Sequence, residues 1–117
     1  MRKVTLYHNP KCTKSRQALE EIKKRHFEYE TIEYLKFPLT KKEIRELLVK
    51  LNMGVKEIIR KEESIYKEKY KTSEFTNEEW LEILEANPKL MQRPIMVIGD
   101  KATIGRPLEN VIELLNS

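Results

Sequence analysis

The spacing of apolar residues divides the chain into segments of two kinds. A short apolar run at 4–8 is typical of a buried strand, and apolar side chains one helical turn apart predict an amphipathic helix over about 13–25. Residues 27–34 alternate in polarity and include aromatic and β-branched side chains, which favours a second strand. A strand–helix–strand unit of this kind usually forms a right-handed parallel crossover.

The middle of the chain has the helical period and two helix-start signals. Thr40 with Glu43, and Thr76 with Glu79, each form the capping-box pattern that begins a helix. Apolar residues follow the first box at positions i, i+3, i+4 and i+7: Ile44, Leu47, Leu48 and Leu51. We therefore expect a helical block over about residues 40–88.

The last third of the chain predicts a hairpin and a helix. Residues 94–98 form a compact apolar strand, Gly99-Asp100 suits a two-residue turn, and residues 101–104 return antiparallel. Pro107 would occupy the first position of a final helix, where its missing N–H costs nothing. The buried face of that helix is expected to consist of Leu108, Val111, Ile112 and Leu115.

Without the helical block, the order of elements is that of a thioredoxin-like fold. We predict an α/β chain with a mixed four-stranded sheet, built as a single thioredoxin-like domain over residues 1–117 with the block inserted at about 40–88. Pro94 opens the third strand, a position at which we predict a cis Arg93–Pro94 bond.

Composition restricts the class of protein. The 117 residues are 39% hydrophobic and 36% charged with a net charge of +4, and basic residues alternate with acidic ones, which argues against a nucleic-acid-binding stripe. No apolar run approaches about 20 residues, so we expect no membrane span. Residues 1–4 lead into the first strand without a signal-peptide pattern, and the single cysteine fits a reducing compartment. We expect a cytoplasmic monomer.

Cys12 is the residue that carries the most chemical information. It lies where the first strand ends and the first helix begins, so its sulfur faces free backbone N–H groups and the positive end of the helix dipole. Those groups favour the thiolate and also bind an oxyanion. A lone cysteine is more commonly a small buried hydrophobe. The polar flanking sequence, with Pro, Lys, Thr and Ser, favours the nucleophile.

Three further polar residues surround this junction in the sequence. His8 would lower the Cys12 pKa as an imidazolium, or would hydrogen-bond to the loop as a neutral ring. Ser15 would donate its hydroxyl to the thiolate, or would satisfy backbone donors of the first helical turn. Arg16 would add positive potential. One cysteine and two separated histidines give no zinc-type spacing, so we expect no metal.

Three arginines are notable for their placement. Arg93 precedes Pro94, Arg106 precedes Pro107, and Arg60 follows an apolar stretch in the helical block. An isolated arginine is usually a surface ion-pair partner of small energetic value. Two arginines beside prolines at element boundaries are harder to explain in that way. The arginine fork is also suited to planar or tetrahedral oxyanions.

Taken together, these motifs resemble the glutaredoxin-coupled arsenate reductase family. The motifs are Tyr7-His8-Asn9-Pro10-x-Cys12-x-x-Ser15-Arg16, Ile58-Ile59-Arg60-Lys61, Arg93-Pro94-Ile95 and Gly105-Arg106-Pro107, and the likeness covers the chain from end to end. The resemblance implies that Cys12 attacks arsenate, that Arg60, Arg93 and Arg106 hold the oxyanion, and that His8 and Ser15 tune the thiolate. It also implies glutathione as co-substrate, glutaredoxin as partner and no bound cofactor.

Two other functions are compatible with this fold. One is a redox-responsive transcription regulator that binds RNA polymerase, although many such regulators use a Cys-x-x-Cys switch and this chain has Ser15 at the second position. The other is a glutathione-dependent thiol reductase with a different substrate, because substrate identity is a property of the site and not of the fold.

Overall fold

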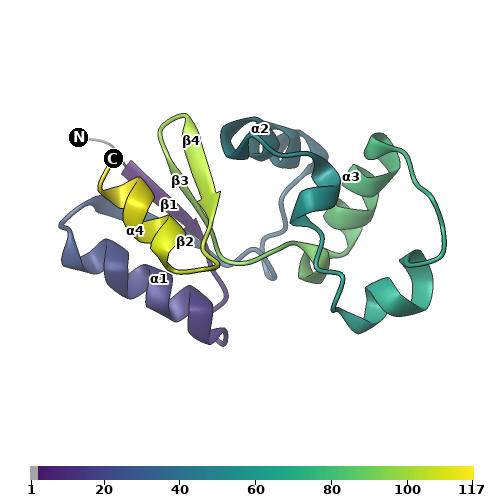
Figure 1. Cartoon of the computed structure of the whole chain (residues 1–117), viewed down its shortest axis with the longest axis horizontal. Helices are drawn as coiled ribbons and strands as arrows, with labels where there is room; N and C mark the ends of the chain where they lie inside the picture. Colours follow the sequence, from purple (N-terminus) through teal and green to yellow (C-terminus); the bar gives the residue numbers. More distant parts are fainter. Residues whose placement is uncertain (1–2) are drawn as a thin grey trace. The chain divides into compact units, whose positions relative to one another are not determined.

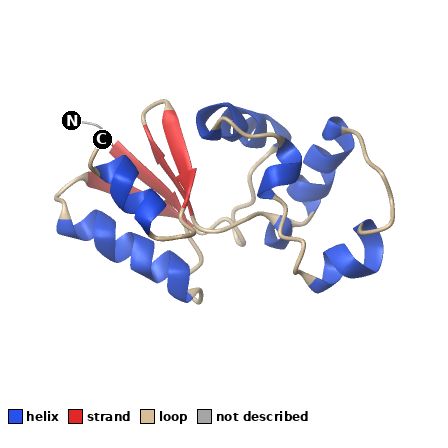
Figure 2. Ribbon diagram, in the orientation of Figure 1, coloured by secondary structure: helices blue, strands red, loops and turns tan. Residues whose placement is uncertain are grey.

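The computed structural model describes residues 3–117, and the prediction about the N-terminus falls partly on Met1 and Arg2, which lie outside that range. Its four strands are β1 (Lys3–Tyr7), β2 (Glu28–Ile32), β3 (Ile95–Ile98) and β4 (Lys101–Ile104). They form one sheet in the order β2-β1-β3-β4, in which β2 runs parallel to β1 and the other neighbours are antiparallel (Figures 1 and 2). This confirms the predicted mixed four-stranded sheet.

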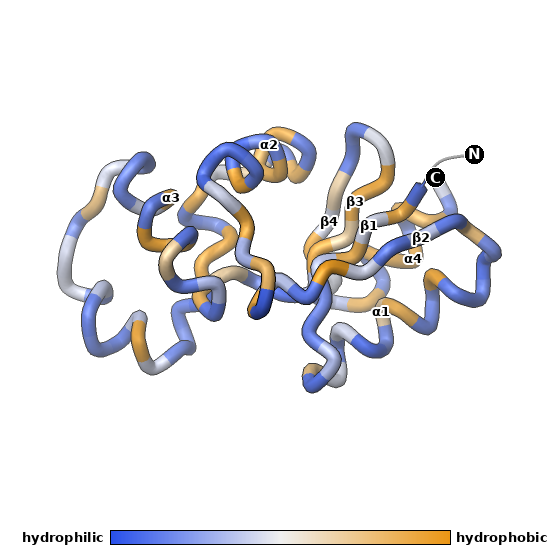
Figure 3. The backbone as a smooth tube through the Cα atoms, turned by 180° about the vertical axis from the view of Figure 1, so that it is seen from behind, coloured by the Kyte–Doolittle hydropathy of each residue, from blue (hydrophilic) through white to orange (hydrophobic). Residues whose placement is uncertain are grey.

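Two helices, α1 (Thr13–Lys24) and α4 (Glu109–Leu115), cover one face of this sheet (Figure 1). The core between them consists of Val4, Leu6, Ala18, Ile22, Met96, Ile98, Val111 and Leu115. Apolar burial of this kind is the main stabilising term of a small domain. The edge strand β2 is exposed along most of its length. Its mostly blue colour in Figure 3 shows that it is also largely hydrophilic.

The predicted helical block is present. Its elements are α2 (Lys41–Leu51), the 3₁₀ turn η1 (Val55–Ile58), the π-helical turn η2 (Tyr66–Tyr70), α3 (Asn77–Ala86) and the 3₁₀ turn η3 (Pro88–Leu90). Both capping boxes are formed, with Thr40 at the start of α2 and Thr76 at the start of α3. Asn52 ends α2 in the left-handed conformation with φ 57°. Ile59 and Met91 additionally form an antiparallel bridge.

The chain consists of two compact units. The sheet unit comprises residues 1–37 and 93–117, and the helical unit comprises residues 38–92. The prediction of one domain with an insert stays a prediction. Within residues 3–117, no helix is long and apolar enough to cross a membrane.

The structure differs from the sequence prediction at the last helix. That helix begins at Glu109 and not at Pro107, because the turn before it closes through an i+3 bond from the Asn110 N–H to the Pro107 carbonyl. Leu114 rather than Ile112 packs against the core.

Two other predictions for the last third of the chain are confirmed. Gly99 has φ 59°, as the Gly-first turn requires, and the Arg93–Pro94 bond is cis.

Candidate active site

Cys12 is the N-cap residue of α1. The loop before it is closed by Asn9, whose carbonyl accepts the Cys12 N–H at 2.9 Å and whose side-chain oxygen accepts the Lys11 N–H at 3.1 Å. The Cys12 side chain is only 9% exposed. The loop therefore places the buried Cys12 sulfur next to the free N–H groups at the start of the helix.

The Cys12 thiol is more acidic than an ordinary cysteine. Burial by itself would raise its pKa, but the backbone N–H groups of Ser15 and Lys14, the charge of Arg93 and a hydrogen bond from Arg106 together bring the pKa below 9.0. Each of these groups stabilises the negative sulfur more than the neutral thiol. The sequence prediction that Cys12 favours the thiolate is consistent with this setting.

Two of the three predicted arginines lie at the sulfur. Arg106 donates from Nη2 to the Cys12 sulfur at 3.8 Å and from Nε to the Arg93 carbonyl at 2.9 Å. Burial opposes the charge of Arg93, but the neighbouring Tyr34 and Cys12 side chains outweigh it and raise the pKa of Arg93 above its usual value. Arginine side chains carry a positive charge at physiological pH, so these two guanidinium groups place positive charge at the Cys12 sulfur.

Pro94 and Gly105 bring these two arginines together by close packing. The Gly105 N–H donates to the Pro94 carbonyl at 2.8 Å. A Cβ atom at position 105 would lie 2.7 Å from Pro94 Cγ, closer than real Cβ contacts, and 3.1 Å from Val111 Cγ2, which is tighter than most of them. Glycine is therefore required at the point where β4 passes the start of β3.

His8 and Ser15 form a buried pair below the loop. His8 Nδ1 and Ser15 Oγ are 2.6 Å apart, and Ser15 Oγ accepts the Asn9 N–H at 3.0 Å. Burial lowers the pKa of His8 below 6.5, with help from the charges of Arg16 and Lys23 and against the effect of Glu33. This lowered pKa favours the neutral ring of the two alternatives. Ser15 satisfies a backbone donor of the loop.

Arg16 stabilises the same loop through two side-chain hydrogen bonds. Its Nη1 donates to the Pro10 carbonyl at 2.8 Å and its Nη2 to the Thr13 hydroxyl at 3.2 Å. Its charge reaches His8, whose pKa it lowers. Among residues 3–117, no group of three His, Cys, Asp or Glu side chains could hold a metal ion.

Arg60 belongs to the helical unit. Its side chain is 8% exposed, and it pairs with Glu62 at 3.2 Å and Glu63 at 3.1 Å. Its backbone N–H donates to the Leu90 carbonyl at 2.6 Å. Its predicted place as the third oxyanion-binding arginine stays a prediction.

Tyr34 is a site residue that the sequence analysis missed. The side chain is fully buried and stabilises the cationic form of Arg93. In the sequence it is one of several aromatic residues in an alternating segment, which predicted only a strand. No local pattern distinguishes a tyrosine that contacts a distant arginine from one that packs in a core.

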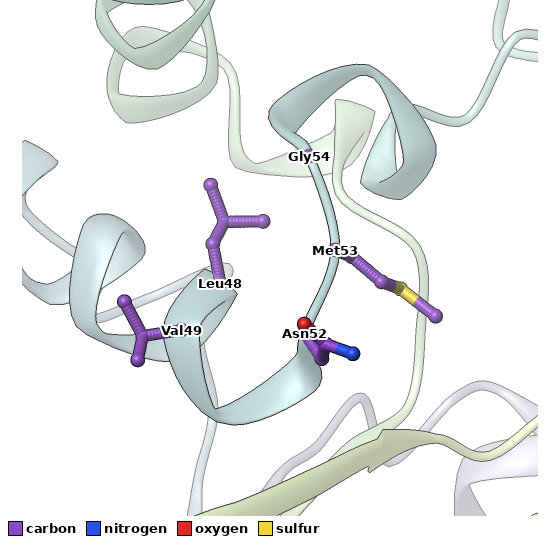
Figure 4. Close-up of a pocket in the computed structure, with 5 residues that line it drawn as sticks. All are labelled: Leu48, Val49, Asn52, Met53 and Gly54. Carbon is purple, nitrogen blue, oxygen red and sulfur yellow. The ribbon is translucent and has the colours of Figure 1, made fainter.

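A separate hollow lies in the helical unit, at the end of α2 (Figure 4). It is open, has a volume of about 510 Å³ and is lined by Leu48, Val49, Asn52, Met53 and Gly54. None of these side chains can act as a nucleophile, an acid or a base. The candidate chemistry therefore remains at Cys12.

The sequence matches the ArsC family over residues 7–114, a range that includes every predicted site residue. This chain belongs to the ArsC family. It is 40% identical over 116 residues to the uncharacterized protein YfgD of Escherichia coli, covering 97% of this chain and 98% of that protein. It is also 34% identical over 116 residues to an arsenate reductase of E. coli, covering 98% of this chain and 82% of that protein.

Solved structures of ArsC-family proteins have the same fold. An arsenate reductase from Vibrio cholerae matches with a TM-score of 0.90 and 33% identity, covering 96% of this chain and 97% of that one. The thioredoxin-like fold predicted from the order of elements is thus confirmed.

Proposed function

We propose that this ArsC-family protein reduces arsenate, with Cys12 as the nucleophile. The observation that carries the proposal is the Cys12 sulfur at the N-terminus of α1, with a lowered pKa and with Arg106 donating to it. Names of relatives such as the E. coli arsenate reductase support the choice of substrate.

The site residues have separate tasks in this proposal. The Cys12 thiolate attacks arsenic and forms an S–As bond, while an arsenate hydroxyl takes up a proton from solvent and leaves as water. Arg93 and Arg106, together with the N–H groups at the start of α1, bind the remaining oxygens and stabilise the charge that develops on them. His8, Ser15 and Arg16 hold the loop in shape.

The electrons must come partly from outside the chain. Reduction of arsenate to arsenite takes two electrons, which two thiols supply as they become a disulfide. The chain has one cysteine, so a second thiol has to enter the site. In our proposal this thiol is glutathione, and glutaredoxin completes the reduction. No bound cofactor is needed for this electron count.

The test is NADPH consumption with arsenate, glutathione, glutathione reductase and glutaredoxin. We expect turnover that depends on arsenate and is abolished in Cys12→Ser. Arg93→Gln and Arg106→Gln should each lower kcat/KM by about tenfold to a hundredfold, because each removes a hydrogen-bonded charge. Arg25→Gln is the matched control, since Arg25 bonds to Glu21 and Asn116 at the far end of α1.

Full activity in Cys12→Ser would contradict the mechanism. No turnover of the folded protein with any glutaredoxin would contradict the choice of substrate. In that case the same assay, with other substrates in place of arsenate, tests whether the protein is a glutathione-dependent thiol reductase. Co-purification with RNA polymerase tests a regulatory role.

A further inference from the structure

The turn that carries Arg106 connects β4 to α4 within the sheet unit. Because β4 ends at Ile104 and α4 begins at Glu109, Arg106 lies beyond the end of the strand. Arg106 is also exposed, and an exposed arginine side chain samples many rotamers. Its guanidinium therefore stays at the Cys12 sulfur only if the surrounding structure restricts it.

Asn110, in the first turn of α4, is hydrogen-bonded to this turn three times. Its side-chain Nδ2 donates to the Ile104 carbonyl at 3.2 Å and to the Arg106 carbonyl at 3.2 Å. Its backbone N–H donates to the Pro107 carbonyl at 3.0 Å. Because a side-chain amide has two N–H donors, the two carbonyls use both of them. The amide thus joins the end of β4 to the arginine two positions further on.

The two carbonyls that the amide joins lie on either side of Gly105. A glycine has more backbone freedom than any other residue, so a turn that contains one needs bonds from neighbouring elements to keep a single shape. On the β3 side, the Gly105 N–H donates to the Pro94 carbonyl at 2.8 Å. On the α4 side, the Asn110 amide supplies the bonds.

The guanidinium of Arg106 makes two bonds of its own. Nε donates to the Arg93 carbonyl at 2.9 Å, and Nη2 donates to the Cys12 sulfur at 3.8 Å. Both bonds depend on where the turn places the Arg106 backbone, because a change in its φ or ψ moves the whole side chain. The bonds from Asn110 are made to that backbone, so Asn110 acts on the guanidinium indirectly.

We propose that Asn110 is a positioning residue that holds the turn of Gly105, Arg106 and Pro107 in the shape that places the Arg106 guanidinium at the Cys12 sulfur. The inference rests on the proposed function for the anion that the guanidinium binds, whereas the effect on the thiol needs no substrate. A guanidinium that is already in place loses little rotamer freedom when an anion arrives, so the anion binds more tightly.

The experiment measures the rate at which iodoacetamide alkylates Cys12 from pH 5 to 9 without arsenate. We expect Asn110→Ala to shift the profile to higher pH. Below the pKa of the thiol, alkylation should slow by about twofold to fivefold, because Arg106 stabilises the thiolate less. Asn116→Ala is the matched control and should leave the profile unchanged. It removes an asparagine at the other end of α4, where Oδ1 accepts from Arg25 Nε at 3.2 Å.

A double variant separates positioning from a general effect on the fold. If Asn110 acts through Arg106, adding Asn110→Ala to Arg106→Gln should leave the profile where Arg106→Gln alone puts it. A purely structural role would lower the free energy of unfolding in urea and leave the profile unchanged. If Asn110→Ala does not fold, Asn110→Leu is measured with the same expectation, since it keeps a side chain of similar size and removes the same donors.

Protection of Cys12 by arsenate in the same assay gives an arsenate dissociation constant without turnover. We expect this constant to rise by about threefold to tenfold in Asn110→Ala and by about tenfold or more in Arg106→Gln. Asn116→Ala should again match the unaltered protein.

The outcomes distinguish this inference from the proposed function. An unchanged alkylation profile in Asn110→Ala overturns the inference, as does a further shift when Arg106→Gln is already present. An unchanged arsenate constant in Asn110→Ala overturns it as well. If arsenate gives the unaltered protein no protection while Asn110→Ala still shifts the profile, the proposed function fails and the positioning of Arg106 at the sulfur stands.

Discussion

The acidity of the Cys12 thiol depends on groups from separate segments of the sheet unit. Backbone N–H groups come from the first turn of α1, Arg93 precedes β3, and Arg106 follows β4. Because the elements that carry these groups are packed together, the thiolate is stabilised before any ligand arrives. The contribution of either arginine to the Cys12 pKa can be removed by a single substitution.

We expect Arg106→Gln to raise the pKa of Cys12, because the variant removes the hydrogen bond and the charge that favour the thiolate. At neutral pH, the fraction of thiolate then falls and alkylation by iodoacetamide slows. The rate measured from pH 5 to 9 should shift to higher pH relative to the unaltered protein and Arg25→Gln. Superimposable profiles would show that Arg106 does not act on the sulfur.

His8 gives the chain a pH-dependent stability. Its pKa in the folded state lies below 6.5, so the folded state resists protonation more than the unfolded chain does. The stabilising effect is complete above pH 6.5 and is lost as the pH falls through the folded pKa. We expect the free energy of unfolding in urea to decrease from pH 7.5 to pH 5, and His8→Gln to reduce this decrease.

The same measurement in a Cys12→Ser background removes the contribution of the thiol, whose pKa is also lowered by folding. If the free energy of unfolding falls equally with pH in the presence and absence of His8, the pH dependence comes from other groups.

Single residues were predictable where their chemistry depends on local sequence. Cys12 follows a strand and begins a helix, and that junction alone predicts an anion-stabilised sulfur. The partner of Ser15 was not predictable, because His8 and Asn9 reach its hydroxyl only after the loop has closed. Contact between Tyr34 and Arg93 likewise depends on the packing of segments that are distant in sequence.

At the scale of elements, helix starts were predicted better than contacts between elements. Thr40 and Thr76 cap their helices as expected, because a capping box is completed within four residues. The close approach of Gly105 to Pro94 was not predicted. This contact arises because β3 pairs with β4. A short stretch of sequence does not show which residues that pairing brings together.

We expect Gly105→Ala to destabilise the sheet unit by about 1–3 kcal/mol, because the added Cβ overlaps the Pro94 ring. The measurement is the free energy of unfolding in urea. Gly54→Ala is the matched control, since the nearest atom to its added Cβ would be Glu57 Oε2 at 3.7 Å, an ordinary contact. Equal effects of the two substitutions would show that the β3–β4 junction relaxes freely.

For the whole molecule, the number of thiols restricts the redox chemistry. The single cysteine, Cys12, forms no internal disulfide, so oxidation in the presence of glutathione should give one mixed disulfide per chain. Intact-mass spectrometry after treatment with diamide and glutathione measures this. We expect one adduct, removed by glutaredoxin and absent in Cys12→Ser. An adduct that glutaredoxin leaves in place would contradict the proposed reductant.

The edge strand β2 also affects how copies of this chain meet in concentrated solution. An exposed strand edge offers unpaired backbone groups to a second sheet, which is a common start of aggregation. If two copies aligned antiparallel about the middle of β2, Glu30 of one would face Glu30 of the other. Like charges directly opposite disfavour such pairing. The acidic side chains of β2 therefore disfavour the addition of a second copy at this edge of the sheet.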